Sequence, residues 1–154
     1  MDVIRNNVKG LDGLAQLRSL LDGGVQPPIG GTLGFSLVEV EKGRALFEGE
    51  PGHHVYNPIG AVHGGYAATL LDSACGCAAH SMLTASQGYT TLELKISYHR
   101  PLNDSSGLVK AEGRIVSIGR RAAFAEAKLT DAAGKLCASA TSTLLIFDVK
   151  AEAH

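Results

Sequence analysis

The chain has 154 residues, of which 45% are hydrophobic and 19% are charged, so it can bury one sizeable core but is too short to favour a second domain. Its formal net charge of -1 excludes a main role in neutralising nucleic-acid phosphates. Residues 1–21 mix charged and apolar side chains, unlike the continuous apolar run of a secretory signal, and we therefore expect a cytoplasmic protein.

The N-terminal part predicts one short helix. In segment 11–21, one helical face can be shared by Leu14, Leu17, Leu20 and Leu21. Gly23 and Gly24 end this helix, and the prolines and glycines of residues 27–31 predict a connecting loop. We accordingly divide the chain into a helical extension at residues 1–28, one domain at residues 29–148 and a polar tail at residues 149–154.

Six further segments have the composition and turn signals of strands. They are residues 35–40, 44–50, 89–98, 108–117, 122–130 and 136–147. Segment 89–98 has the clearest pattern, because Leu92, Leu94 and Ile96 alternate strictly with polar residues.

Between the second and third of these strands lies a long apolar segment that predicts a buried helix beginning near His63. Alanine, leucine and cysteine residues surround most of its circumference, so it has no evident solvent face. Asp72 interrupts this surface, and a buried carboxylate is costly unless it is paired or meets a polar pocket. A structural contact of Asp72 with a loop is as plausible at this point as a catalytic one.

The cysteines and histidines give no metal-site pattern. The odd number of cysteines favours reduced thiols, and Cys75 and Cys77 point about 200° apart on a helix, as core residues rather than a metal clip. No HExxH or CxxC motif is present. We therefore expect neither a metal nor a redox cofactor.

The order of these elements predicts an α+β fold. A helix too apolar to lie on a surface must be enclosed, and the strands each have one apolar face that could enclose it. We expect one antiparallel sheet wrapped around the long central helix, with an extra N-terminal helix.

Several motifs together resemble one known family. They are Asn57, the His63-Gly64-Gly65 run, Asp72, the segment Gly88–Pro101 and the turn Gly119-Arg120-Arg121. Their spacing resembles that of hotdog-fold thioesterases, specifically the phenylacetate-degradation, or PaaI-like, branch, over residues 30–147. The resemblance implies hydrolysis of acyl-CoA thioesters with aryl, short-chain or medium-chain acyl groups, and CoA as part of the substrate.

The resemblance also implies roles for individual residues. Asp72 would act as general base or as nucleophile, and the Gly64 backbone N–H would stabilise the oxyanion. Gly65 beside it would permit close approach of the substrate. Asn57 would orient the carbonyl or the water, and His63 would anchor the start of the helix.

A threonine of the facing strand should add a hydroxyl group. We prefer Thr91 to Thr90, because alternation puts Thr91 on the polar face with Glu93 and Thr90 on the apolar face with Leu92. Related enzymes with a helix glutamate can carry a threonine one turn later, where this chain has Gly76, so water positioning would fall to Asn57, Thr91 or Ser73.

Basic residues at two places could bind the CoA phosphates. The candidates are Arg120 and Arg121 in one turn, and His99 and Arg100 at a strand end. A solvated hairpin is an equally simple explanation of the two adjacent arginines.

In the family the opposing strand commonly comes from a second subunit, which implies a homodimer or a dimer of dimers (a homotetramer). No membrane or nucleic-acid partner is expected. Two other functions stay open: an acyl-CoA hydratase or dehydratase that uses His63 and Asp72 as an acid–base pair, and a non-catalytic acyl-CoA-binding module.

Overall fold

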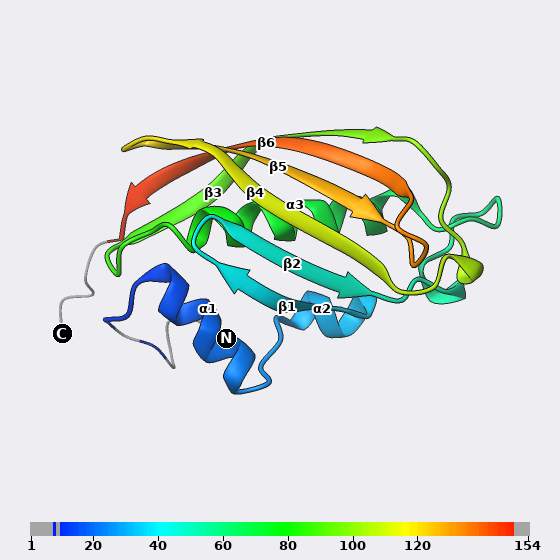
Figure 1. Ribbon diagram of the computed structural model, residues 1–154, viewed down its shortest axis with the longest axis horizontal. Coiled ribbons are helices and arrows are strands. Elements are labelled where there is room, and N and C mark those ends of the chain that lie inside the picture. Colours follow the sequence, from blue (N-terminus) through cyan, green and yellow to red (C-terminus); the bar gives the residue numbers. More distant parts are fainter. Residues whose placement is uncertain (1–7, 9, 150–154) are drawn as a thin grey trace.

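The computed structural model describes residue 8 and residues 10–149 of the protein. Six strands form one antiparallel sheet in the order β1-β2-β4-β5-β6-β3. Their bounds are β1 Phe35–Glu41, β2 Arg44–Gly49, β3 Gln87–Tyr98, β4 Val109–Ile118, β5 Ala122–Thr130 and β6 Leu136–Asp148. The sheet curls around one long helix, α3 (Gly64–His80), which confirms the predicted α+β hotdog architecture (Figure 1).

Helix α3 can lie inside the sheet because its residues are small and apolar. Leu70, Leu71 and Ala74 are fully buried against the strands. A Cβ atom at Gly113 of β4 would collide with the Ala74 backbone and lie 2.8 Å from the Cys75 nitrogen. Glycine at this position therefore lets the helix approach the sheet closely.

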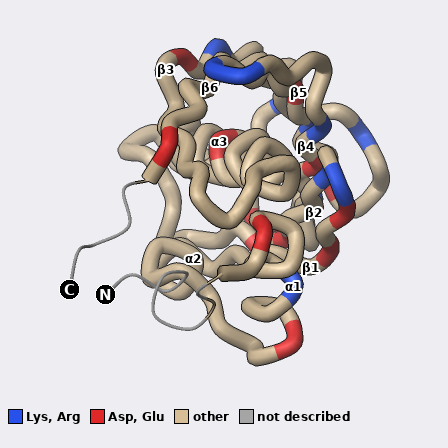
Figure 2. The backbone as a smooth tube through the Cα atoms, turned by 90° about the vertical axis from the view of Figure 1, so that its left-hand side faces the viewer, with Lys and Arg blue, Asp and Glu red and all other residues tan. Residues whose placement is uncertain are grey.

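One stripe of α3 differs from the expectation of a helix without a solvent face. The two ends of the sheet order, β1 and β3, do not meet, and the helix is enclosed incompletely between them. The half-buried residues that recur at helical spacing along this stripe are Ala68, Thr69, Asp72, Ser73 and Cys77. Figure 2 shows α3 lying between the sheet and the N-terminal helices. The only carboxylate of α3 thus lies on its most accessible side.

Strand β3 contains a bulge that its sequence pattern conceals. Thr91 pairs with Leu144 and Glu93 pairs with Thr143, which leaves Leu92 as the extra residue. The strict alternation expected for this strand was therefore wrong at Leu92, whose side chain is 62% exposed. The bulge puts Thr91 on the helix-facing side together with Leu94.

The N-terminal part forms two helices, α1 (Gly13–Asp22) and α2 (Pro28–Leu33). The first was predicted, but the connecting loop expected at residues 27–31 is wrong, because Pro28 begins a helix with its fixed φ angle in a favourable first position. Gly34 ends α2 in the left-handed conformation, with a φ angle of 74°. Of the predicted polar tail, only Val149 lies within the described residues.

Helix α1 is attached to the C-terminal end of α3. The Gly13 N–H donates to the Leu83 carbonyl at 2.9 Å, and a Cβ atom at Gly13 would overlap the His80 carbonyl. The Gln16 side chain and the His80 imidazole are joined by a 2.7 Å hydrogen bond. Within the described residues, none of the helices is long and apolar enough to cross a membrane.

Candidate active site

Asp72 and Thr91 form the centre of the candidate site. The Thr91 hydroxyl donates to Asp72 Oδ1 at 3.0 Å, across the space between β3 and α3. Asp72 Oδ2 has no hydrogen-bond or ionic partner among the described residues. One oxygen is therefore held in place while the other is available to attack or to activate water. Thr91 faces Asp72 because of the bulge at Leu92, and not because it shares a strand face with Glu93, as the sequence pattern suggested. Thr90 is exposed on the outer side of the sheet.

The start of α3 offers one unoccupied backbone donor. His63 is the N-cap, and its Nδ1 accepts from the Gly65 N–H at 2.8 Å. The preceding Gly64 N–H has no acceptor within the described part of the chain. Because this N–H lies at the positive end of the helix dipole, it is suited to bind an oxyanion, whereas the Gly65 N–H is already used.

Asn57 is involved in the tight turn before α3. Its Oδ1 accepts from the Ile59 and Ala61 N–H groups, both at 3.1 Å. Its side-chain NH₂ group makes no hydrogen bond to any of the described residues. Asn57 therefore fixes the loop with its oxygen and could still orient a carbonyl or a water with its nitrogen.

Gly64 and Asp72 are too far apart on one helix to act on the same thioester. Eight residues separate them, which is about 12 Å along an α-helix. A thioester carbonyl that reacts with Asp72 would have its carbon about 3–3.5 Å from the attacking atom and its oxygen about 3 Å from the N–H donor. One carbonyl group therefore cannot reach both Asp72 and the Gly64 N–H of the same helix. His63 is one residue further from Asp72, about 13.5 Å along the helix, so the acid–base pair of the hydratase alternative is also too far apart within one protomer.

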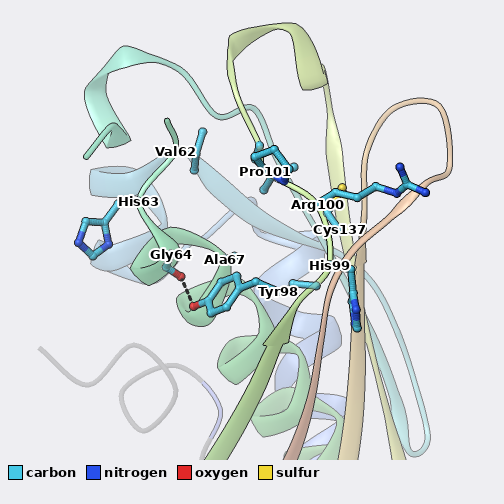
Figure 3. A pocket seen from close by; sticks show the side chains of 11 residues that line it. Val62, His63, Gly64, Ala67, Tyr98, His99, Arg100, Pro101 and Cys137 are labelled. Atoms are coloured by element: carbon cyan, nitrogen blue, oxygen red, sulfur yellow. Dashed lines mark hydrogen bonds between the residues drawn. The ribbon is translucent and has the colours of Figure 1, made fainter. Parts of the chain in front are cut away.

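A pocket of about 310 Å³ lies beside the Gly64 end of α3 (Figure 3). Its walls include Tyr98, His99 and Arg100 from the end of β3. The Tyr98 hydroxyl donates to the Gly64 carbonyl at 2.7 Å, and the Tyr98 ring points toward the helix. The His63 side chain points away from Tyr98. His99 is hydrogen-bonded to Ser139, 2.8 Å away, so Arg100 is the freer of the two candidates for a phosphate contact.

The second pair of candidate phosphate ligands lies at the other end of the sheet. Arg120 and Arg121 occupy the β4–β5 turn, and the Arg121 carbonyl accepts from Ile146, which pairs with Tyr89 near the start of β3. His99 and Arg100 follow the end of the same strand. Because β3 has 12 residues, these two groups cannot reach one phosphate within a single protomer.

Two tyrosines near the site were not singled out from the sequence. Tyr98 contacts Gly64, and the Tyr89 ring lies over Gly76, where an added Cβ atom would be 2.5 Å from the Tyr89 hydroxyl. The Tyr89 ring therefore occupies the space that a threonine side chain would need at position 76. With the bulge at Leu92, Tyr89 and Thr91 face the helix on the same side of β3 as Leu94. Regular alternation without the bulge would put them on the opposite side from Leu94, which is why the sequence did not point to Tyr89.

The cysteines near Asp72 are thiols and not thiolates. Burial, and then the charge of Asp72, raises the pKa of Cys75 and of Cys77 to about 12. Neither is therefore a nucleophile at neutral pH. Among the residues that the structure describes, no group of three or more histidine, cysteine or acidic side chains could hold a metal ion.

Comparisons with known proteins agree with the fold. The family model described as "Thioesterase superfamily" matches residues 59–138. The chain is 29% identical over 115 residues to a 1,4-dihydroxy-2-naphthoyl-CoA hydrolase from Listeria monocytogenes, covering 75% of this chain and 92% of that protein.

Two solved structures are similar in both fold and sequence. A mutant of the phenylacetic acid degradation protein PaaI from Thermus thermophilus has a TM-score of 0.70 at 28% identity, covering 77% of this chain and 98% of that one. A Streptococcus mutans protein bound to acetyl-CoA has a TM-score of 0.69 at 27% identity, with 77% and 92% covered.

Proposed function

The chain belongs to the thioesterase superfamily, and from that premise we propose that it hydrolyses acyl-CoA thioesters with Asp72 as the catalytic carboxylate. The main observation in favour is the Asp72–Thr91 contact, which orients a half-buried carboxylate on the accessible stripe of α3 and leaves Oδ2 free. The similarity to a naphthoyl-CoA hydrolase and to a protein bound to acetyl-CoA supports an acyl-CoA substrate. CoA is the leaving group of the substrate, so the reaction requires no cofactor.

In this mechanism Asp72 Oδ2 either attacks the thioester carbon, giving an acyl anhydride that water then hydrolyses, or removes a proton from a water that attacks the carbon directly. On either route the C–S bond breaks, CoA leaves as the thiol and the acyl group is released as the free acid. The negative charge that develops on the carbonyl oxygen is stabilised by the Gly64 N–H at the start of α3. Thr91 is a positioning residue, because it acts through Asp72.

We further propose that the two halves of each site come from two chains. The separation of about 12 Å between Gly64 and Asp72 supports this arrangement, because two antiparallel copies of α3 that cross near Ala68 would put Gly64 of one chain beside Asp72 of the other. Ala68 is small and half-buried, so it permits close approach of the helices. In such a dimer Arg100 and the Arg120–Arg121 turn would face one site from different chains.

The first experiment measures the release of free CoA from acetyl-, hexanoyl- and benzoyl-CoA. We expect Asp72→Asn to lower kcat by about 10² to 10⁴-fold on every substrate, the usual range for loss of a general base. Thr91→Val should lower kcat about tenfold or more, and Thr91→Ser should restore it, because a hydrogen bond to a charged group contributes about 1.5–3 kcal/mol.

Asp22→Asn is the matched control, since Asp22 is an exposed carboxylate at the end of α1. Full activity of Asp72→Asn would contradict the proposed function. Hydration of an unsaturated acyl-CoA without CoA release would instead favour the hydratase, and binding without either reaction would favour the binding module.

Mixing two inactive variants tests the shared site. Gly64→Pro removes the donor N–H and should keep the helix start, because proline suits the first helical position and His63 before it already has an extended ψ angle of 134°. The added Cβ atom would lie 3.0 Å from the hydroxyl of the exposed Tyr98 side chain, which can move.

An equal mixture of Asp72→Asn and Gly64→Pro chains forms mixed dimers with one intact site each. We expect it to recover about a quarter of the native activity if subunits exchange randomly in a two-fold dimer. No recovery, with exchange verified by mass spectrometry, would contradict the shared site.

A further inference from the structure

A second, more apolar cavity of about 380 Å³ lies between α3 and the N-terminal helices. It begins beside the candidate catalytic carboxylate, because Ser73 and Cys77 of its lining continue the half-buried stripe that contains Asp72. The β1–β2 hairpin contributes Phe35, Leu37 and Phe47. The cavity therefore lies beside the stripe of α3 that carries the reacting group, with Ser73, the residue next to Asp72, in its wall.

Tyr89 links this cavity to the site. It lines the cavity and lies two residues before Thr91 on the helix-facing side of β3. The Tyr89 hydroxyl makes no hydrogen bond to any of the described residues. Burial raises the pKa of Tyr89, so at neutral pH the phenol is a hydrogen-bond donor without a protein acceptor.

The far wall of the cavity is made by the N-terminal extension. Leu17, Leu20 and Leu21 of α1 line it, followed by residues 25–27 and Ile29. The position of this wall is fixed by the close contact of Gly13 with His80 and by the Gln16–His80 hydrogen bond. The family model matches only residues 59–138, so these residues belong to a part of the chain that it does not describe.

We propose that this cavity holds the acyl group of the substrate, that α1 sets the size of the group, and that the preferred acyl group contains one or two rings. This inference rests on the proposed thioester hydrolysis. An apolar cavity of about 150 Å³ holds benzene, so a space of 380 Å³ is large enough for a bicyclic acyl group. Acetyl would leave most of it empty, and the Tyr89 hydroxyl would donate to a polar ring substituent.

The test compares kcat/KM for 1-naphthoyl-CoA and for acetyl-CoA, expressed as a ratio. Leu21→Trp fills the cavity from α1, and Leu21 is only half-buried, so the larger ring can be accommodated by the fold. We expect the ratio to fall at least about tenfold, the usual effect of a few atoms in a substrate pocket. Arg18→Trp is the matched control, because it adds the same ring on the exposed side of α1 and should leave the ratio unchanged.

Cys77→Leu gives an independent test from the opposite wall, in case Leu21→Trp does not fold. It should also lower the ratio, since the added atoms project from α3 into the same space. An unchanged ratio in both folded variants would overturn the inference without affecting the proposed hydrolysis.

The opposite failure can be recognised as well. If the native protein hydrolyses none of the thioesters, the proposed function is wrong, and the cavity is tested by titration with 1-naphthoate. Weaker binding to Leu21→Trp than to Arg18→Trp would still support an aryl-binding cavity, and equal binding would overturn it.

Discussion

Replacing Gly76 with alanine tests the packing of Tyr89 on α3. Gly76 lies in the interior of the helix, where alanine is ordinarily more stable than glycine by about 1 kcal/mol. In this protein the new Cβ atom would be 2.5 Å from the Tyr89 hydroxyl and 3.1 Å from two carbons of its ring. The Tyr89 ring would have to move, and its movement is restricted by His80, whose ring centroid lies 5.9 Å from that of Tyr89.

Overpacking of this kind costs about 1–3 kcal/mol, which outweighs the gain in helix propensity. We therefore expect Gly76→Ala to lower the free energy of unfolding by up to about 2 kcal/mol. Tyr89→Phe removes the atom of the shortest contact, and the nearest of the remaining ring atoms lie at 3.1 Å. In that background Gly76→Ala should be neutral or stabilising, which gives a coupling energy of about 1 kcal/mol or more.

The assay is urea unfolding of the four proteins of this double-mutant cycle. Gly31→Ala in α2 is the control for helix propensity, since a Cβ atom there meets nothing within 4 Å. Stabilisation by Gly76→Ala in both backgrounds, equal to that of the control, would refute the assigned position of the Tyr89 ring.

Two other groups give predictions about stability. Tyr66→Phe should raise the free energy of unfolding by about 1 kcal/mol, because the Tyr66 hydroxyl is buried without a partner among the described residues; a loss of stability in urea unfolding would show that the hydroxyl is satisfied. Burial lowers the pKa of His80 below its ordinary value of 6.5, so the unfolded chain takes up a proton first and the free energy of unfolding should decline as the pH falls below about 6.5. This decline in the free energy of unfolding should level off below the pKa of His80 in the folded protein, and it should be weaker in His80→Gln. Identical pH profiles of the two proteins in calorimetry would contradict the predicted role of His80.

Much of the fold could be predicted because hydrophobic patterning follows burial directly. The apolar segment after His63 forms the enclosed helix, and the six strands lie where their turn signals separate them. The exception at Pro28 has a local cause, since two prolines and two glycines permit a loop and a short helix equally well, and the packing of α2 beside β1 decides between them.

The candidate site was less predictable, because it depends on register. Thr91 was selected for the wrong reason, as the choice assumed continuous alternation through Leu92. A bulge residue has no reliable sequence signature, and Val116 of β4 is a second case, exposed at 63% beside the register shift between Ile115 and Ser117. Tyr89 could not be found for the same reason.

The bulge in β3 also determines how this chain should be aligned with distant relatives. Leu92 is the only residue between Gln87 and Tyr98 without a partner on β6, so deleting it would leave every other side chain of the strand on its present face. Deletion of any residue in the paired segments would exchange the two faces on one side of the gap. A relative with a shorter strand should therefore be aligned with its gap at Leu92, and an alignment without a gap would compare Thr91 with a position on the opposite side of the sheet.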